Sequence, residues 1–227
     1  MEKVILHHLG MGDHLICNGL VRKILQEDGL ILHYPLKFHN YDNVIAMLGD
    51  LSDRIKFVPI KDDGEMIRYA SNFPEKNKIR VGVFKSDWES LSGAFCEKFY
   101  KQIGIPYSER WNLFYFPERR SMSIESGSKE SCFVHQDLSR NLKIKSIYLP
   151  DSYYSPNHSL GSNSNHTIFD YVQLLNEVDE IHCIDSSFAC LIDHLPSLNK
   201  KKKFIHRYVR KNSENPIYKN NWMIIYE

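Results

Sequence analysis

The first half of the chain alternates short apolar runs with segments whose apolar residues recur at helical spacing. The run at 4–8 is typical of a buried strand, and residues 14–27 carry the helical spacing. Further strands are predicted at 30–36, 55–60 and 79–84, and further helices at 41–48, 64–72 and 88–103. Strands that alternate with helices are typical of βαβ units and a parallel sheet. Residues 1–118 therefore predict one small Rossmann-like domain.

A polar stretch separates this pattern from a second one. Residues 119–130 are rich in serine, which predicts a linker between two domains. Beyond it, strands are predicted at 131–135, 146–149, 180–184, 204–208 and 222–226, and helices at 168–178 and 187–195. Residues 131–227 therefore predict a second Rossmann-like domain, and the fold class is α/β.

Composition is ordinary for a globular protein and excludes several functional classes. The 227 residues allow one large or two small domains, and 42% are apolar while 25% are charged. The formal net charge of +1 gives no general attraction to nucleic acid. No stretch approaches the ~18 apolar residues that span a bilayer, and the N-terminus lacks the apolar core of a signal peptide. We therefore expect a cytoplasmic protein with no transmembrane segment and no nucleic-acid partner.

Cysteine and histidine spacing argues against a metal site. The five cysteines are odd in number and include no CxxC pair, and the eleven histidines include no HxH or HxxxH pair. We expect neither a disulfide framework nor a bound metal.

The first candidate site is the turn with Gly10, Gly12 and Asp13, between the first predicted strand and helix. The glycines allow a sharp turn and close approach of a ligand, and free N–H groups at a helix N-terminus favour phosphate or carboxylate. Gly10 and Gly12 are therefore candidate ligand-binding residues. The alternative is structural, with glycines for the turn and Asp13 as the helix cap. A dinucleotide fingerprint needs a third glycine where Leu15 stands, which disfavours NAD.

The second candidate site is Asp185, Ser186 and Ser187, which follow the strand predicted at 180–184. Ligands of open α/β sheets bind beyond the carboxyl ends of strands, where a carboxylate and two hydroxyls could bind a ribose or a sugar. The alternative is again helix capping, by Asp185 or Ser186. The GxSxG turn of a serine nucleophile is absent from this segment.

The third candidate site is the basic stretch after the strand predicted at 131–135. Arg140 is suited to bidentate phosphate binding, and Lys145 lies five residues further on. The alternative is a solvated surface loop.

Two of these motifs resemble one known family. Residues 9–24 resemble the N-terminal signature of the lipopolysaccharide heptosyltransferases, glycosyltransferase family 9. Residues 185–191, Asp-Ser-Ser-Phe-Ala-Cys-Leu, resemble the family's second signature, an Asp-Ser/Thr-Gly turn. The order of the motifs fits the GT-B layout, in which two Rossmann-like domains face a cleft. The family's glycine in the second turn is Ser187 here, and its following histidine is Cys190.

The resemblance implies roles for the matching residues. Asp13 matches the acidic residue proposed as the catalytic base, and Asp185, Ser186 and Ser187 match the turn that holds the nucleotide sugar. Arg140 or Lys145 would neutralise the donor diphosphate in place of a metal.

The expected function is transfer of a sugar from a nucleotide-diphosphate donor to a hydroxyl of a glycan or lipid-linked glycan. The reaction would need no metal and no cofactor, because the nucleotide sugar is a co-substrate. One alternative is a non-catalytic relative that still binds a nucleotide or a glycan. Another is a sugar-nucleotide epimerase or a hydrolase, but the missing third glycine and the missing Tyr-xxx-Lys dyad weigh against an epimerase.

Overall fold

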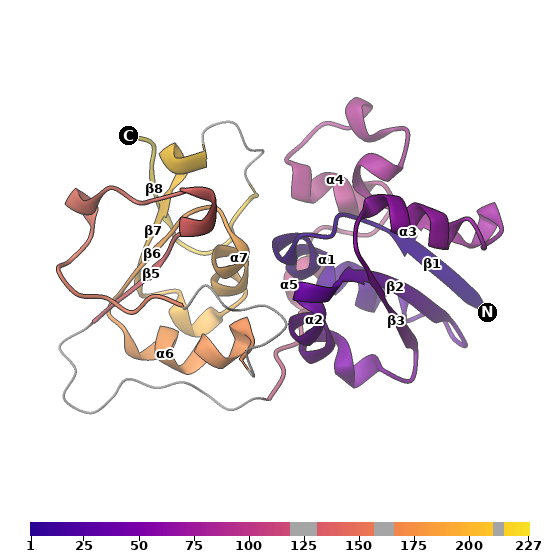
Figure 1. Cartoon of the computed structure of the whole chain (residues 1–227), viewed down its shortest axis with the longest axis horizontal. Helices are drawn as coiled ribbons and strands as arrows, with labels where there is room; N and C mark the ends of the chain where they lie inside the picture. The colour runs from indigo at the N-terminus through magenta and orange to yellow at the C-terminus, as the bar shows by residue number, and fades with distance from the viewer. Residues whose placement is uncertain (119–130, 157–165, 211–215) are drawn as a thin grey trace. The chain divides into compact units, whose positions relative to one another are not determined.

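The computed structural model describes residues 1–118, 131–156, 166–210 and 216–227. The chain divides into two compact units, Met1–Pro117 and Glu118–Glu227, and each contains one parallel sheet of four strands with interleaved helices (Figure 1). This arrangement confirms the predicted α/β fold class. The linker predicted at 119–130 lies outside the described residues.

The sheet of the first unit reverses its strand order at β1. Its strands are β1 (Glu2–Leu6), β2 (Ile31–Lys37), β3 (Ile55–Ile60) and β4 (Lys78–Arg80). They lie in the order β3-β2-β1-β4. The helices of this unit are α1 (Met11–Ile24), α2 (Tyr41–Leu48), α3 (Asp63–Ala70), α4 (Phe95–Lys101) and α5 (Glu109–Asn112). Right-handed crossovers place α1 and α2 on one face and α3 on the other, because the chain changes direction after β3.

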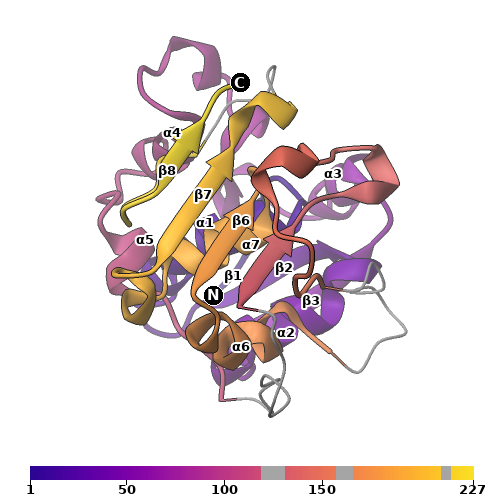
Figure 2. The same cartoon turned by 90° about the vertical axis from the view of Figure 1, so that its left-hand side faces the viewer.

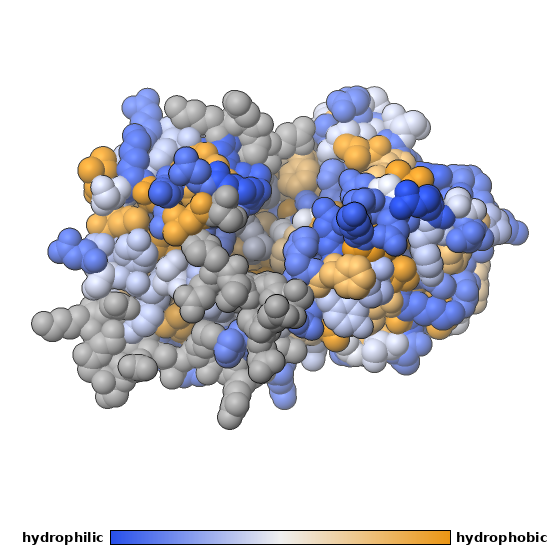
Figure 3. All heavy atoms as spheres, viewed as in Figure 1, coloured by the Kyte–Doolittle hydropathy of each residue, from blue (hydrophilic) through white to orange (hydrophobic). Residues whose placement is uncertain are grey.

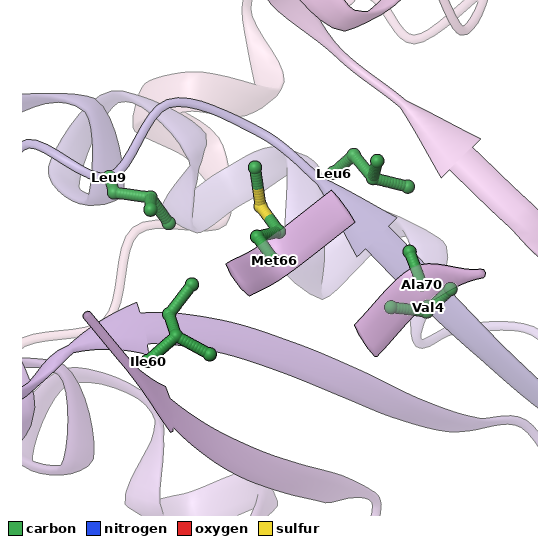
Figure 4. Packing of buried hydrophobic residues seen from close by; sticks show 6 residues of the cluster. All are labelled: Val4, Leu6, Leu9, Ile60, Met66 and Ala70. Carbon is green, nitrogen blue, oxygen red and sulfur yellow. The ribbon is translucent and has the colours of Figure 1, made fainter. Parts of the chain in front are cut away.

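Apolar side chains of β1 and α3 form the core on one face of this sheet. Figure 4 shows the six buried residues of the cluster, which are Val4, Leu6, Leu9, Ile60, Met66 and Ala70. Met66 and Ala70 are four residues apart and therefore lie on the same side of α3. Ile5 has no exposed surface either, so β1 is covered on both faces. A strand covered on both faces needs a continuous apolar run, which explains why residues 4–6 are all apolar.

The sheet of the second unit keeps its strands in chain order. Its strands are β5 (Cys132–His135), β6 (Glu180–Cys183), β7 (Lys202–His206) and β8 (Met223–Ile225), shown side by side in Figure 2. With all crossovers in one direction, the right-handed rule places α6 (Val172–Glu177) and α7 (Ser187–Asp193) on one face. The segment 142–149 packs on the other face, where Ile144 lies against Val134 of β5.

Several elements differ from the sequence prediction because turns replace regular structure. The strand predicted at 79–84 ends at Arg80 as β4, and a 3-10 turn, Gly82–Phe84, follows it. The strand predicted at 146–149 is a single 3-10 turn, Ser146–Tyr148. The helix predicted at 88–103 is a 3-10 turn at Trp88–Ser90 followed by α4, which begins only at Phe95. Gly93 between them has a φ of 110°, which a helix does not accommodate. Apolar spacing alone does not reveal such an interruption.

Exposed apolar residues do not form one continuous surface on the face drawn in Figure 3, where they are interspersed with hydrophilic residues. Large exposed ones include Phe38 in the first unit, which is 62% exposed, and Ile147 in the second, which is 79% exposed. Within the described ranges, no helix combines the length and the apolarity needed to cross a bilayer.

Close packing of α1 on α5 generates a first prediction. A Cβ atom on Gly19 would lie 1.9 Å from the main-chain oxygen of Glu109, so the backbones must separate to admit a side chain. We expect Gly19→Ala to lower the free energy of unfolding by roughly 1–3 kcal/mol or more, measured by urea denaturation. Gly49→Ala is the matched control, because Gly49 has a φ of −66° and no atom within 4 Å of an added Cβ. It should raise stability by about 0.4–1 kcal/mol; equal effects of the two variants would contradict the packing argument.

Candidate functional site

The reversal of strand order at β1 locates the candidate site of the first unit. In open α/β sheets, ligands bind beyond the carboxyl ends of strands at the point where the order reverses. In this sheet that point lies between β1 and β4, which pair in parallel with Leu6 opposite Arg80. The residues that follow these two strands are therefore the ones to examine, and they include the turn at Gly10 and Asp13.

Asp13 lies in the first turn of α1 and is not its cap. The capping residue is Gly10, with φ −76° and ψ 147°, which has no side chain to accept a hydrogen bond. The Asp13 carboxylate folds back over the glycine, because a Cβ added to Gly10 would lie 2.7 Å from Asp13 Oδ2. Asp13 and Gly12 are both half-buried. The structural alternative of Asp13 as the helix cap is therefore not realised, since the helix begins one turn earlier than the apolar spacing predicted.

Beneath this turn lie three buried polar rings that sequence reasoning did not single out. His14 Nδ1 is 2.8 Å from the Tyr34 hydroxyl, and the ring of His7 packs against both, with its centroid 4.9 Å from that of His14 and 4.7 Å from that of Tyr34. The Pro35 carbonyl can only accept, so the 3.1 Å contact with His7 Nε2 places a hydrogen on that nitrogen. The alternation of side chains along β2 could have indicated that Tyr34 is buried. No pattern among neighbouring residues, however, indicates that its hydroxyl contacts His14.

Burial keeps both histidines neutral. It lowers the pKa of His7 to about 4 and lowers that of His14 well below its usual range, because desolvation penalises the charged imidazole. No histidinium therefore neutralises the Asp13 carboxylate near neutral pH. The negative charge of Asp13 in turn adds to the effect of burial in raising the pKa of Cys17 and of Tyr34.

His8 occupies the β4 side of the same crevice. Its Nε2 accepts a hydrogen bond from the Val83 main-chain N–H at 3.3 Å, so in the neutral ring the hydrogen lies on Nδ1. Gly82 makes this contact possible, because its φ is 73° and an added Cβ would lie 2.4 Å from the His8 ring. Phe99 packs against the ring with centroids 5.3 Å apart.

In the second unit, the structure turns Asp185 inward. Its side chain is 3% exposed, and its Oδ1 accepts a hydrogen bond from the Tyr218 hydroxyl at 3.0 Å. Arg207 Nε lies 3.6 Å from the other oxygen. Burial raises the pKa of the Asp185 carboxyl group, and Arg207 and Tyr218 offset this only in part. The chain's own residues therefore surround the carboxylate.

The two serines begin α7. Ser186 is its capping residue, and its hydroxyl accepts a hydrogen bond from the Ala189 N–H at 3.4 Å. Ser187 is the first helical residue and is half-buried. Of the two residues that the capping alternative offered, Ser186 is the helix cap and Asp185 is not.

The predicted cations Arg140 and Lys145 both follow β5, but they make different contacts. Arg140 is exposed and pairs with Asp137, with Nε 2.5 Å from Oδ2. Lys145 donates its main-chain N–H to the Tyr208 hydroxyl at 2.8 Å, and its Nζ lies 4.9 Å from the centroid of the same ring. Lys145 is thereby tied to the segment that follows β7.

The structure also brings two arginines to the Asp185 turn. Arg207 and Arg210 follow β7 in a 3-10 turn, and Arg210 Nη1 donates to the Asp185 main-chain oxygen at 2.6 Å. Their signal in the sequence is two basic residues just after a predicted apolar strand. The carboxyl edge of the second sheet thus carries cations from the loops after β5 and after β7. Within the described part of the chain, no three His, Cys, Asp or Glu residues are placed to hold a metal ion.

Comparison with known proteins finds only distant structural likeness. No protein-family model and no curated protein matches the chain. A solved structure of E. coli heptosyltransferase WaaC with ADP-2-deoxy-2-fluoro heptose is similar to 99% of this chain and 92% of its own, at 12% identity and a TM-score of 0.44. Another, of the same enzyme with ADP, has a TM-score of 0.43 at 12% identity and covers 99% and 90% of the two chains. Likeness at this level carries no information on activity, which must be argued from the residues of this chain.

The buried histidines under the Asp13 turn predict acid sensitivity. The folded pKa of His7 is lowered to about 4, so the unfolded chain binds a proton more readily, and stability is lost as the pH falls from about 6.5 towards 4. At pH 5 the loss amounts to about 2 kcal/mol for such a histidine. We expect His7→Gln, which keeps a donor for the Pro35 carbonyl, to flatten the pH dependence of urea denaturation. His39→Gln, at an exposed position, is the control and should change the pH dependence of the free energy of unfolding less. If this pH dependence were the same in His7→Gln as in the wild type, the prediction would be contradicted.

Proposed function

We propose that the protein is a glycosyltransferase that moves a hexosyl- or heptosyl-type sugar from a nucleotide diphosphate to an acceptor hydroxyl. The acceptor would be a glycan or a lipid-linked glycan, and the reaction would need no metal. The observation that carries the proposal is the position of Asp13. It lies over a glycine cap, at the carboxyl edge of the first sheet where the strand order reverses.

Asp13 has the surroundings that a carboxylate base requires. It is half-buried, so an acceptor hydroxyl can reach it, and the N-terminus of the 14-residue helix α1 favours its ionised form. The neighbouring His7 and His14 are neutral, so neither of these two rings offsets its charge. General-base catalysis of this kind contributes about 10²–10⁴-fold to a rate.

The donor diphosphate would bind at the carboxyl edge of the second sheet. Arg140 and Lys145 are exposed there, and Arg210 adds a third cation beside the Asp185 turn. Fixed cations that face a developing charge can replace a metal in stabilising a leaving group. In this proposal Ser186 and Ser187 line the donor site, and Asp185 holds the turn in place through Tyr218.

The proposed reaction exchanges one bond at the anomeric carbon. Asp13 takes the proton of the acceptor hydroxyl while that oxygen forms a bond to the anomeric carbon. The bond from this carbon to the diphosphate oxygen breaks, and the electron pair leaves with the nucleoside diphosphate. The transition state is oxocarbenium-like, as in glycoside hydrolysis. The proposal requires the two carboxyl edges to face a common cleft, which stays a prediction.

A non-catalytic nucleotide- or glycan-binding protein is the second candidate. The observation that favours it is the burial of Asp185, whose carboxylate contacts Tyr218 and Arg207 instead of an open site. Such a protein would bind a nucleoside diphosphate without hydrolysing any donor sugar.

Replacing the proposed base tests the proposal. We expect the wild type to release nucleoside diphosphate slowly from at least one of a panel of UDP-, GDP- and ADP-sugars, with water as the acceptor. Asp13→Asn should lower this rate at least about 100-fold, because the base is lost. Its affinity for the nucleoside diphosphate, measured by calorimetry, should stay unchanged.

Asp42→Asn is the matched control, because Asp42 is also an acidic residue in the first turn of a helix of the same unit and is exposed. It should keep the wild-type rate. Full hydrolysis by Asp13→Asn would remove the base assignment, nucleotide binding without hydrolysis would favour the non-catalytic candidate, and no nucleotide binding would end both.

A further inference from the structure

Three titratable side chains of the second unit form a continuous hydrogen-bonded chain that the proposed reaction does not use. Glu180 Oε1 lies 2.6 Å from His182 Nε2, and His182 Nδ1 lies 2.8 Å from His206 Nε2. His182 is 3% exposed and His206 has no exposed surface. We call these three residues the histidine chain. It joins the amino end of β6 to the carboxyl end of β7.

The direction of each hydrogen bond follows from the donors available. The Glu180 carboxylate can only accept, so His182 carries its hydrogen on Nε2 and presents a bare Nδ1. His206 must then donate from Nε2, which leaves its Nδ1 bare, and this buried atom has no hydrogen-bond partner among the described residues. One added proton leaves the link between the two rings possible, because the ring that stays neutral can still accept. On either ring, however, it puts a hydrogen on His206 Nδ1, and no acceptor for it lies among the described residues. With both rings protonated, two N–H groups would face each other across 2.8 Å.

The end of the histidine chain lies under residues of the proposed donor edge. The His206 ring is 5.3 Å from the ring of Tyr148 and 5.6 Å from the ring of Tyr208, centroid to centroid. Tyr208 accepts the main-chain N–H of Lys145 and lies under its ammonium group. The next residue after His206 is Arg207, which pairs with Asp185.

Few other charges face the histidine chain. Along the same face of the sheet, Cys132 of β5 and Lys202 of β7 are each in register with Glu180. Burial, with the charge of Glu180, raises the pKa of the Cys132 thiol to about 12, so this group stays neutral. From above, the face is covered by the phenols of Tyr148 and Tyr208, and Tyr148 donates to the main-chain oxygen of Glu227 at 2.6 Å. The charged side chains that face the histidine chain are therefore those of Glu180 and Lys202.

We propose that the histidine chain is an acid-sensitive switch, in which proton uptake puts a hydrogen on the buried Nδ1 of His206, where no acceptor lies among the described residues, and thereby loosens the segments 145–149 and 207–210. These segments carry Lys145, Arg207 and Arg210, so the switch also weakens anion binding at the donor edge. The second consequence rests on the proposed function, whereas the first does not.

The sign of the effect follows from the burial of His206. Desolvation, and then the charge of His182, lowers the pKa of His206 to about 4, below the 6.5 of a free histidine. The closed form therefore binds fewer protons than the opened form, and it loses stability as the pH falls from about 6.5 towards 4. Because the two rings interact, the apparent midpoint of the opening belongs to the pair and not to either histidine alone.

Hydrogen–deuterium exchange of the full chain tests the switch without any ligand. We expect peptides that cover 145–149 and 207–210 to exchange at least about tenfold faster at pH 5 than at pH 7, after correction for the intrinsic rate. His206→Phe keeps the ring packing and removes the titrating group, so its exchange should not depend on pH in this way.

Two further variants keep the test decisive if His206→Phe fails to fold. His206→Gln can still donate to His182 Nδ1 but does not titrate, so its exchange should also lose this dependence on pH. His166→Asn removes a 57%-exposed histidine of the same unit and should leave the midpoint unchanged. A pH effect that persists in His206→Phe or in His206→Gln would overturn the switch.

Calorimetry with ADP, UDP and GDP at both pH values separates the switch from the proposed function. A switch seen in exchange, with nucleotide affinity that falls at pH 5, supports both. A switch seen in exchange without any nucleotide binding supports the switch and contradicts the donor site.

Discussion

The pairing of β1 between β2 and β4 is the constraint on which the first unit depends. Val4, Ile5 and Leu6 are almost fully buried, so β1 has to lie inside the sheet and be covered on both faces. Because β1 is central, the strand order reverses beside it. The turn that follows β1 therefore lies where the ligands of such sheets bind. Gly10 and Asp13 owe their position to this arrangement, and Gly82 supplies the room on the β4 side.

The two units offer different chemistry at the carboxyl edges of their sheets. In the first unit the edge is formed by a glycine-capped helix, a carboxylate and neutral imidazoles, which suit proton transfer. In the second unit the strand order does not reverse, and the edge is lined by basic side chains from the loops after β5 and β7. Arg210 donates to the main-chain oxygen of Asp185, and Lys145 donates its main-chain N–H to the hydroxyl of Tyr208. The positive charges of these two side chains make this edge suitable for an anion.

Buried histidines lie under both edges and give each of them a polar support. His14 bonds to Tyr34 beneath the Asp13 turn, and His206 bonds to His182 beneath the residues after β7. Buried polar groups fix one geometry, because any other leaves a donor or an acceptor unsatisfied. The same burial that fixes this geometry at neutral pH makes it sensitive to acid, since a charged imidazole is costly to bury.

The sequence by itself determined what depends on neighbouring residues. It predicted the bounds of α2 and β3 as the structure has them, and it offered Ser186 as a helix cap, because apolar spacing and caps are local properties. Its cap at Asp13 was wrong, since α1 begins at Met11. Only the tertiary structure decided that Asp185 turns inward, that Arg207 meets it and that His182 faces His206. These contacts join residues more than twenty positions apart, and they follow from sheet register, which no local pattern encodes.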